Sequence, residues 1–159
     1  MAISNHERVG KALDLLKEGL APFVEREMKA QHAQLWFEQA KASVSDSQAG
    51  LFGSGEEPRW DVAALLAVMW NQWQVVFRKT LGQAERTFVS ELRGVRNKWA
   101  HQQAFSSDDA YRALDSVGRL VAAISAPQGE EIEKMKMELL RVRFDEQARG
   151  ERRKSAGTA

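Results

Sequence analysis

Apolar side chains recur at steps of three and four residues through most of the chain, and no segment alternates in steps of two over a useful length. The pattern is clearest near the two ends, at Val9, Leu13, Leu16 and Leu20 and at Ile132, Met135, Leu139 and Val142. Steps of this size place side chains on one face of an α-helix. With only 3 Pro and 11 Gly in 159 residues, few positions oppose helix formation. We predict an all-α fold, a compact bundle of five to six helices with one long loop.

Polar residues mark three expected helix starts. Ser4 with Glu7, and Ser106 with Asp109, have the spacing at which a cap residue accepts a hydrogen bond from a free backbone N–H of the first turn. Asp61 is a suitable N-cap for the helix that follows it. These residues predict helices that begin just after each cap.

Proline and glycine mark the expected breaks. Pro22 cannot occupy a helix interior without the loss of a hydrogen bond, so we expect a kink there, or a new helix with Pro22 in its first turn that runs to about Val44. Residues 45–59 are rich in Ser and Gly and predict the long loop. A broad apolar face over residues 62–77 predicts a central, buried helix that ends near Gly82.

The chain divides into three segments on this pattern. Residues 1–126 are expected to form the helical domain, and residues 127–149 a C-terminal helix whose narrow apolar seam suits a partner helix or the first helix of the domain. Residues 150–159 are polar and small and have the composition of a linker. We therefore expect the chain to be the N-terminal part of a larger protein.

Several classes of site are absent from the sequence. The chain has no Cys, which excludes disulfides, thiolate metal sites and a cysteine nucleophile. It has no glycine-rich phosphate loop ending in Lys-Ser or Lys-Thr, no His and carboxylate cluster with metal spacing, and no Gly-x-Ser-x-Gly turn. We therefore expect no cofactor and no metal.

The expected location follows from the N-terminus and from the apolar runs. The N-terminus lacks the basic-then-apolar layout of a signal peptide. The longest apolar stretch, residues 62–70, is too short to span a bilayer. We expect a cytoplasmic protein with no membrane partner.

Charge is distributed unevenly although the net charge is only +1. Residues 78–101 contain six basic and two acidic side chains, and residues 141–154 contain six basic and three acidic ones. Local charge of this kind attracts phosphate even when the total is near zero. The first of these segments is the more informative, because its charges lie on a predicted amphipathic helix.

That helix, expected over residues 84–103, separates a core face from a polar face. At 100° per residue, its core stripe consists of Phe88, Leu92, Val95 and Trp99. Arg93, Asn97 and His101 are spaced four apart and form a continuous polar ridge, with Arg96 on the flank of the core stripe.

The segment Arg96-Asn97-Lys98-Trp99-Ala100-His101 resembles the motif of the HEPN superfamily, in which an Arg is followed four to six positions later by a His. The longer run over residues 95–117 resembles small HEPN domains found at the ends of larger bacterial ATPases and helicases of defence-type systems. The resemblance extends over residues 4–125. It implies a helical domain that forms a homodimer and, in active relatives, cleaves RNA without metal to leave a 2′,3′-cyclic phosphate. It also implies a fused or associated ATPase or helicase module.

The residues of the motif suit that chemistry. Histidine titrates near neutrality, so His101 can accept the proton of a 2′-hydroxyl or supply one to the leaving oxygen. Arg96 can hold the phosphate with a bidentate fork, and Asn97 can orient the imidazole or the ribose. Arg93 and Lys98 are candidates for contacts with RNA phosphates. Since Arg96 and His101 are 140° apart on an ideal helix, the two meet best when a dimer brings two chains together.

Simpler readings apply to the same residues. Arg96 can pair with Glu91 or a neighbouring helix, and His101 can serve only to complement the dipole of a helix C-terminus. In that case the domain is a non-catalytic HEPN-like module for dimerisation and interaction. Trp70, Trp73 and Trp99 are expected in the core or in a dimer interface, and His6 and His32 on the surface.

Overall fold

A computed structural model describes residues 3–44 and 61–157, and in these two ranges the chain forms helices and no strand. The elements are α1 (Asn5–His32), the 3-10 turn η1 (Ala33–Leu35), α2 (Trp36–Ala42), α4 (Val62–Asn71), the 3-10 turn η3 (Phe77–Lys79), α5 (Gln83–Ala100), α6 (Ser107–Ala123) and α7 (Gly129–Gly157). The predicted all-α fold is confirmed. The loop predicted at residues 45–59 lies outside the described residues.

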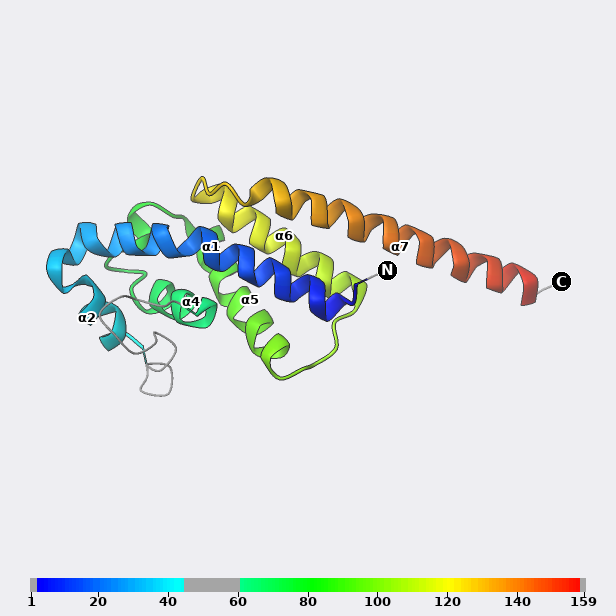
Figure 1. The fold of residues 1–159 in the computed structure, drawn as a ribbon, viewed down its shortest axis with the longest axis horizontal. Coiled ribbons are helices and arrows are strands. Elements are labelled where there is room, and N and C mark those ends of the chain that lie inside the picture. Colours follow the sequence, from blue (N-terminus) through cyan, green and yellow to red (C-terminus); the bar gives the residue numbers. More distant parts are fainter. Residues whose placement is uncertain (1–2, 45–60, 158–159) are drawn as a thin grey trace.

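Helix α1 is the central element of the bundle. It contacts α2, α4, α5, α6 and α7, and Figure 1 shows α6 and α7 on one side of it and α2, α4 and α5 on the other. Its inward side chains, among them Val9, Leu16 and Leu20, have no exposed surface. Burial of a Val or Leu side chain stabilises a fold by about 1.5–3 kcal/mol, so this face accounts for a large share of the core.

The three predicted helix starts are confirmed. The Ser4 hydroxyl accepts from the backbone N–H of Glu7 at 3.1 Å, and the Ser106 hydroxyl accepts from that of Asp109 at 3.0 Å. The Asp61 carboxylate caps α4 by accepting from the N–H of Ala63 at 2.7 Å.

Pro22 does not begin a new helix. Helix α1 continues through it to His32, and the chain turns instead at Ala33, whose φ of 53° lies outside the helical region. Proline removes one donor from the helix, whereas Phe23 and Val24, which follow it, are buried in the core on the helical path. Packing therefore outweighs the local cost.

The predicted helix over residues 62–77 is shorter than expected. Helix α4 ends at Asn71, and Gln72, just after it, contacts Nε2 of His32 through its amide oxygen at 3.1 Å. Trp73 and Phe77 are nevertheless buried, because the turns that follow bring both side chains into the core. His32 was predicted on the surface and is half-buried by this contact. Trp73, being buried in its own chain, offers no area to a dimer.

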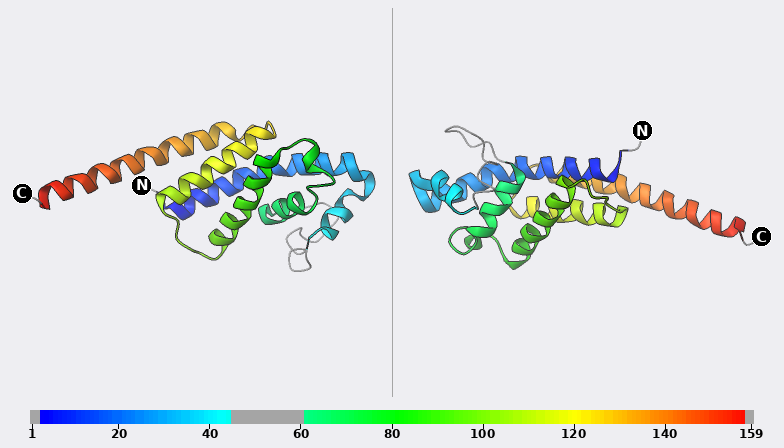
Figure 2. Two further views of the ribbon diagram at one scale, coloured as in Figure 1. Left: turned by 180° about the vertical axis from the view of Figure 1, so that it is seen from behind. Right: turned by 90° about the horizontal axis from the view of Figure 1, so that it is seen from below.

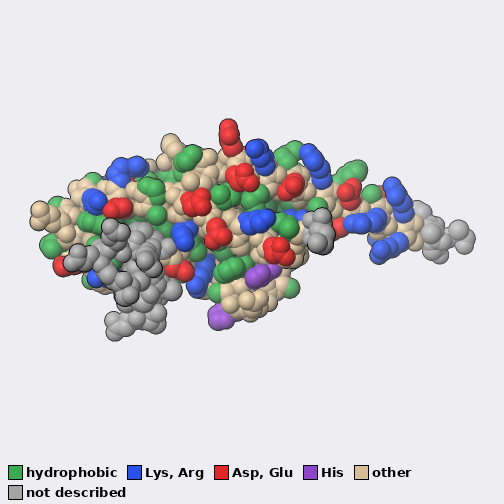
Figure 3. Space-filling model, viewed as in Figure 1, with side chains coloured by type: hydrophobic (Ala, Val, Ile, Leu, Met, Phe, Trp, Pro, Cys, Tyr) green, Lys and Arg blue, Asp and Glu red, His purple; other side chains and the backbone are tan. Residues whose placement is uncertain are grey.

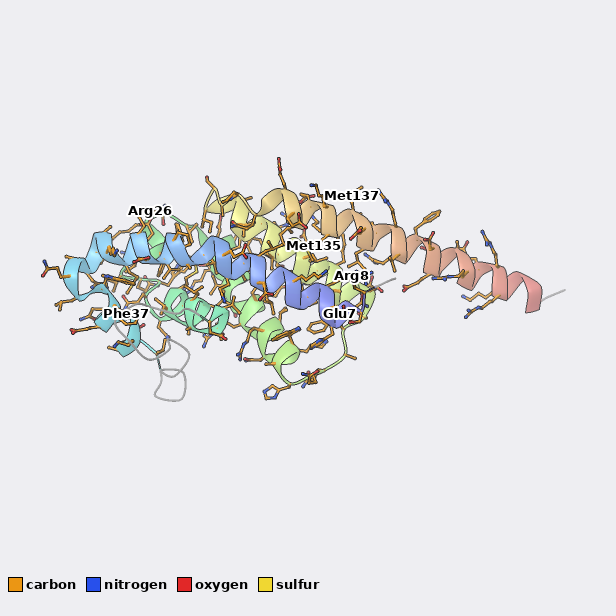
Figure 4. The ribbon with its side chains drawn as sticks, viewed as in Figure 1. Glu7, Arg8, Arg26, Phe37, Met135 and Met137 are labelled. Atoms are coloured by element: carbon orange, nitrogen blue, oxygen red, sulfur yellow. The ribbon has the colours of Figure 1, made fainter. Side chains whose placement is uncertain are left out.

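The apolar seam of α7 packs on α6, its antiparallel neighbour. Ile132 and Leu139 are completely buried, and a Cβ at Gly118 of α6 would approach Ile132 to 3.2 Å, so the small residue allows the close contact. Met135 belongs to this buried seam, whereas Met137 is more than half exposed; both are labelled in Figure 4.

The second half of α7 differs from the prediction. The helix continues past Gly150 to Gly157, where a linker was expected, and it extends beyond the bundle in all three views of Figures 1 and 2. Lys and Arg side chains gather near its far end (Figure 3). Residues 145–154 are mostly Glu, Gln, Arg, Lys and Ala, which favour helix even without a core to pack on. Within the described parts of the chain, no helix has both the length and the apolarity to cross a bilayer.

Candidate active site

Helix α5 carries the predicted motif and is anchored by its apolar face. Leu92 is completely buried, and Phe88, Val95 and Trp99 pack against the core while keeping some exposure, so the predicted stripe is confirmed. Val89, which was not predicted, is also completely buried. The core therefore sets the rotation of α5 and, with it, the direction of every motif side chain.

The C-terminal end of α5 is closed by backbone hydrogen bonds around His101. The N–H of Gln102 donates to the carbonyl of Trp99, and the N–H of Gln103 donates to that of Lys98, both at 3.1 Å. This pairing is the Schellman motif, with His101 as the C-cap and Gln102 in the left-handed region at φ 60°. The backbone that carries the imidazole is therefore held at a defined point.

His6 and Trp99 join the start of α1 to this end of α5. Their rings stack at 5.2 Å with 10° between the planes. The indole Nε1 donates to the backbone carbonyl of His6 at 3.2 Å, and Nε2 of His6 lies 3.0 Å from the carbonyl of Trp99. Gly10 lies beneath the indole, where a Cβ would come within 2.9 Å of Nε1.

His6, expected on the surface, is half-buried, and its ring contacts Trp99 near the end of α5. One signal could have revealed it: His6 is three residues before Val9 and seven before Leu13, on the apolar face of α1. Nothing in the sequence indicates Trp99 as its partner, because the two are far apart in the chain.

Arg96 is directed to the start of α4. Its Nη2 lies 3.7 Å from Oδ1 of Asp61, the carboxylate that also caps α4, and about a quarter of its side chain is exposed. The pairing predicted as one alternative, with a neighbouring helix, is what the structure shows; Glu91 pairs with Arg112 instead. Asp61 is the member of this site that sequence reasoning missed.

Lys98 is engaged with the start of α6. Its ammonium lies 3.3 Å from the Asp109 carboxylate and 4.8 Å from the ring centre of Phe105. The Ser106 hydroxyl and then the Lys98 ammonium hold the pKa of the Asp109 carboxyl below its ordinary value.

The remaining three predicted residues lie together on the polar side of α5. Asn97 and His101 are exposed, and Arg93, one turn before Asn97, is partly exposed. Arg96 does not join them, since it reaches Asp61 on the flank. One chain therefore presents a ridge of Arg93, Asn97 and His101 with a guanidinium beside it, and no convergent Arg–His pair. Among the described residues, no three His or carboxylate side chains are placed to hold a metal ion.

Comparison with known proteins identifies a family. Neither the curated proteins nor the solved structures contain a match to the chain. Residues 11–125 match the family described as Swt1-like HEPN, which confirms the resemblance drawn from the motif. The match covers well over half of the sequence and contains α5 and its motif, and the chain belongs to the Swt1-like HEPN family.

Proposed function

We propose that the protein is a metal-independent endoribonuclease domain whose active site forms between two copies of the chain. The observation that carries the proposal is the placement of His101. Its imidazole is exposed, its backbone is held by the C-terminal cap of α5, and Asn97 precedes it by one turn. An exposed imidazole on a rigid element, next to amide and guanidinium groups, suits proton transfer at a phosphodiester.

The reaction uses two imidazoles in opposite protonation states. A neutral His101 accepts the proton of a 2′-hydroxyl, and that oxygen forms a bond to the adjacent phosphorus. The bond from phosphorus to the 5′ oxygen breaks, and a protonated His101 of the second copy donates its proton to the leaving oxygen. The products are a 2′,3′-cyclic phosphate and a 5′-hydroxyl, and Arg96 stabilises the charge on the phosphoryl oxygens.

The geometry of α5 supports a homodimer. Arg96 and His101 of one chain are about 140° apart around the helix axis, so they do not converge on one phosphate. Two copies related by a twofold axis bring the Arg96 of one chain towards the His101 of the other. A fused or associated ATPase or helicase and a role in bacterial defence belong to the same proposal.

The alternative is a non-catalytic module for dimerisation and interaction. The ion pairs of Arg96 with Asp61 and of Lys98 with Asp109 favour it, because they give both cations a structural role. The two proposals differ in one property only, the cleavage of RNA.

The first test is therefore a cleavage assay with single-stranded and structured RNAs. We expect wild-type protein to cut in the presence of EDTA and to leave cyclic phosphate ends. His101→Ala and Arg96→Ala should each lower the rate by about a hundredfold or more, since acid–base groups and groups that stabilise charge in the transition state each contribute that much. Arg141→Ala, at an exposed arginine on α7, is the matched control and should cut as wild type does.

The second test asks whether the site is shared. Mixing wild type with an excess of His101→Ala after mild unfolding creates heterodimers that have a single His101. Because the reaction uses the imidazoles of both chains, we expect these heterodimers to be inactive, so the activity per wild-type chain should fall on mixing. If the activity per wild-type chain stays constant, the composite site is wrong; if wild type cuts no RNA, the interaction module replaces the nuclease.

A further inference from the structure

A hollow of about 590 Å³ lies where the N-terminal half of α5 meets α4 and α6. Six of the residues that line it bear on the argument: Trp70 from α4, Arg86, Thr87, Ser90 and Glu91 from α5, and Arg112 from α6. None of them belongs to the motif, and the proposed cleavage step uses none of them.

Two of the α5 residues in the hollow align with the motif ridge. At 100° per residue, Arg86, Ser90, Arg93, Asn97 and His101 fall within about 80° around the axis of α5. From Arg86 to His101 is 15 residues, about 22 Å along the helix. The hollow and the motif are therefore two ends of one polar face.

The hollow combines a flat cationic stack with hydrogen-bond donors. The guanidinium carbon of Arg86 lies 4.7 Å from the ring centre of Trp70, and Nε of Arg86 is buried with no hydrogen-bond partner. Arg112 bonds to Glu91 through Nε and Nη2, so Nη1 is the group that can reach an anion. The Arg112 side chain is 76% exposed. Two guanidinium groups against one carboxylate leave the hollow with a net positive charge.

We infer that this hollow binds a nucleotide of a single-stranded RNA whose neighbouring segment lies along the ridge to His101. Unpaired bases stack on aromatic rings and on arginine planes, and the Arg86–Trp70 stack offers both. The phosphate next to that base is held by Nη1 of Arg112 and by the Ser90 hydroxyl, since the Thr87 hydroxyl already donates to the backbone carbonyl of Gln83 at 3.1 Å. Phosphate rather than a neutral ligand is expected because the cations outnumber the carboxylate.

The inference rests on the proposed function only for its ligand, RNA, and it concerns binding rather than cleavage. It predicts a dependence on RNA length. An oligouridylate long enough to span about 22 Å can fill both ends of the face, whereas a uridine dinucleotide can fill one. A variant that lacks the site in the hollow should therefore lose more affinity for the longer RNA than for the dinucleotide.

The experiment measures binding of these two RNAs by fluorescence anisotropy in the His101→Ala protein, which does not consume them. Arg112→Ala should weaken the binding of the oligouridylate by about fivefold or more. The slope of log affinity against log salt is negative, and its magnitude should decrease by about 0.7 because one phosphate contact is lost. Arg86→Ala should weaken the binding of the oligouridylate by about tenfold, as expected for a lost stacking platform. The dinucleotide keeps the motif end of the face in both variants, so its affinity should fall less than that of the oligouridylate.

Arg119→Ala is the matched control, since Arg119 is also an exposed arginine of α6 paired with a carboxylate, but it lies outside the hollow. Equal oligouridylate affinity in Arg112→Ala and Arg119→Ala would overturn the inference. The inference would also be overturned if uridine monophosphate competed for the protein as well as the oligouridylate does, because the hollow would then be a site for free nucleotides. If Arg112→Ala loses RNA binding but wild type cuts no RNA, the nuclease is refuted and the RNA site in the hollow is kept. If wild type cuts RNA but Arg112→Ala binds it as the parent does, the nuclease is kept and the site in the hollow is refuted.

Discussion

Replacement of Gly10 by alanine is expected to destabilise the domain, although the same change at Gly94 should stabilise it. Both glycines lie inside helices, in α1 and α5, where alanine is favoured by about 1 kcal/mol. A Cβ at Gly94 would meet no atom within 4 Å, whereas a Cβ at Gly10 would lie 2.9 Å from Nε1 of Trp99. The two variants therefore share the gain in helix propensity and differ in the contact.

The size of the difference follows from how firmly Trp99 is held. Its indole cannot move away without losing the stack on His6 and the bond from Nε1 to the His6 carbonyl. Overpacking of this kind costs about 1–3 kcal/mol, which exceeds or cancels the gain in propensity. Gly94→Ala should raise the Tm by about 2–4 °C, and Gly10→Ala should leave it unchanged or lower it by up to a few degrees.

Urea and thermal denaturation followed by circular dichroism measure both variants. A double-mutant cycle combines Gly10→Ala with Trp99→Phe, which removes Nε1, the atom nearest to the new Cβ. The cost at Gly10 should then fall, with an interaction energy of about 0.5–3 kcal/mol. If Gly10→Ala is as stabilising as Gly94→Ala, or if the cycle shows no coupling, the clamp between α1 and the motif helix is not rigid and the reasoning fails.

Three further predictions follow from single groups. Gln102→Gly should stabilise the protein by up to about 1 kcal/mol in urea denaturation, because a left-handed φ of 60° strains any residue with a Cβ; a loss of stability would contradict this. His6→Phe keeps an aromatic ring on Trp99 but removes the bond to its carbonyl, so it should cost about 1 kcal/mol, and an unchanged urea midpoint would show that the bond contributes nothing. Burial raises the pKa of Asp115, but hydrogen bonds from Lys136 and Arg119 outweigh it and hold that pKa below its ordinary value. The contribution of Asp115 to stability is thus complete above the unfolded-state pKa of about 3.9 and disappears as the pH falls through the folded-state value, so Asp115→Asn should flatten the acid limb of stability against pH.

The features that could be predicted from the sequence are those that neighbouring residues determine. Ser4, Asp61 and Ser106 cap their helices because a cap needs only its own side chain and a backbone N–H two or three residues away. The seam that contains Ile132 and Leu139 was likewise visible, because a helix repeats its faces at a known interval.

The features that the sequence did not reveal depend on contacts between distant segments. Pro22 remains inside α1 because Phe23 beside it gains burial against Phe77, whose ring centre is 6.0 Å away. The stack of His6 on Trp99 joins residues 93 positions apart, and no periodicity predicts such a pair. Trp73, expected in the core or in a dimer interface, lies in the core because segments distant in the sequence cover it.

The ion pair of Arg96 with Asp61 is compatible with the catalytic role proposed for Arg96. At 3.7 Å and with both side chains partly exposed, a pair of this kind is worth about 0–1 kcal/mol. A phosphate can offer the guanidinium two short, charge-assisted bonds, which are about twice as strong as neutral ones. Asp61 loses little when Arg96 leaves, because it keeps the bond from the N–H of Ala63 that caps α4. The carboxylate can therefore hold Arg96 on the flank of α5 until RNA binds, so one side chain can have a structural role in the free protein and a catalytic role in the complex.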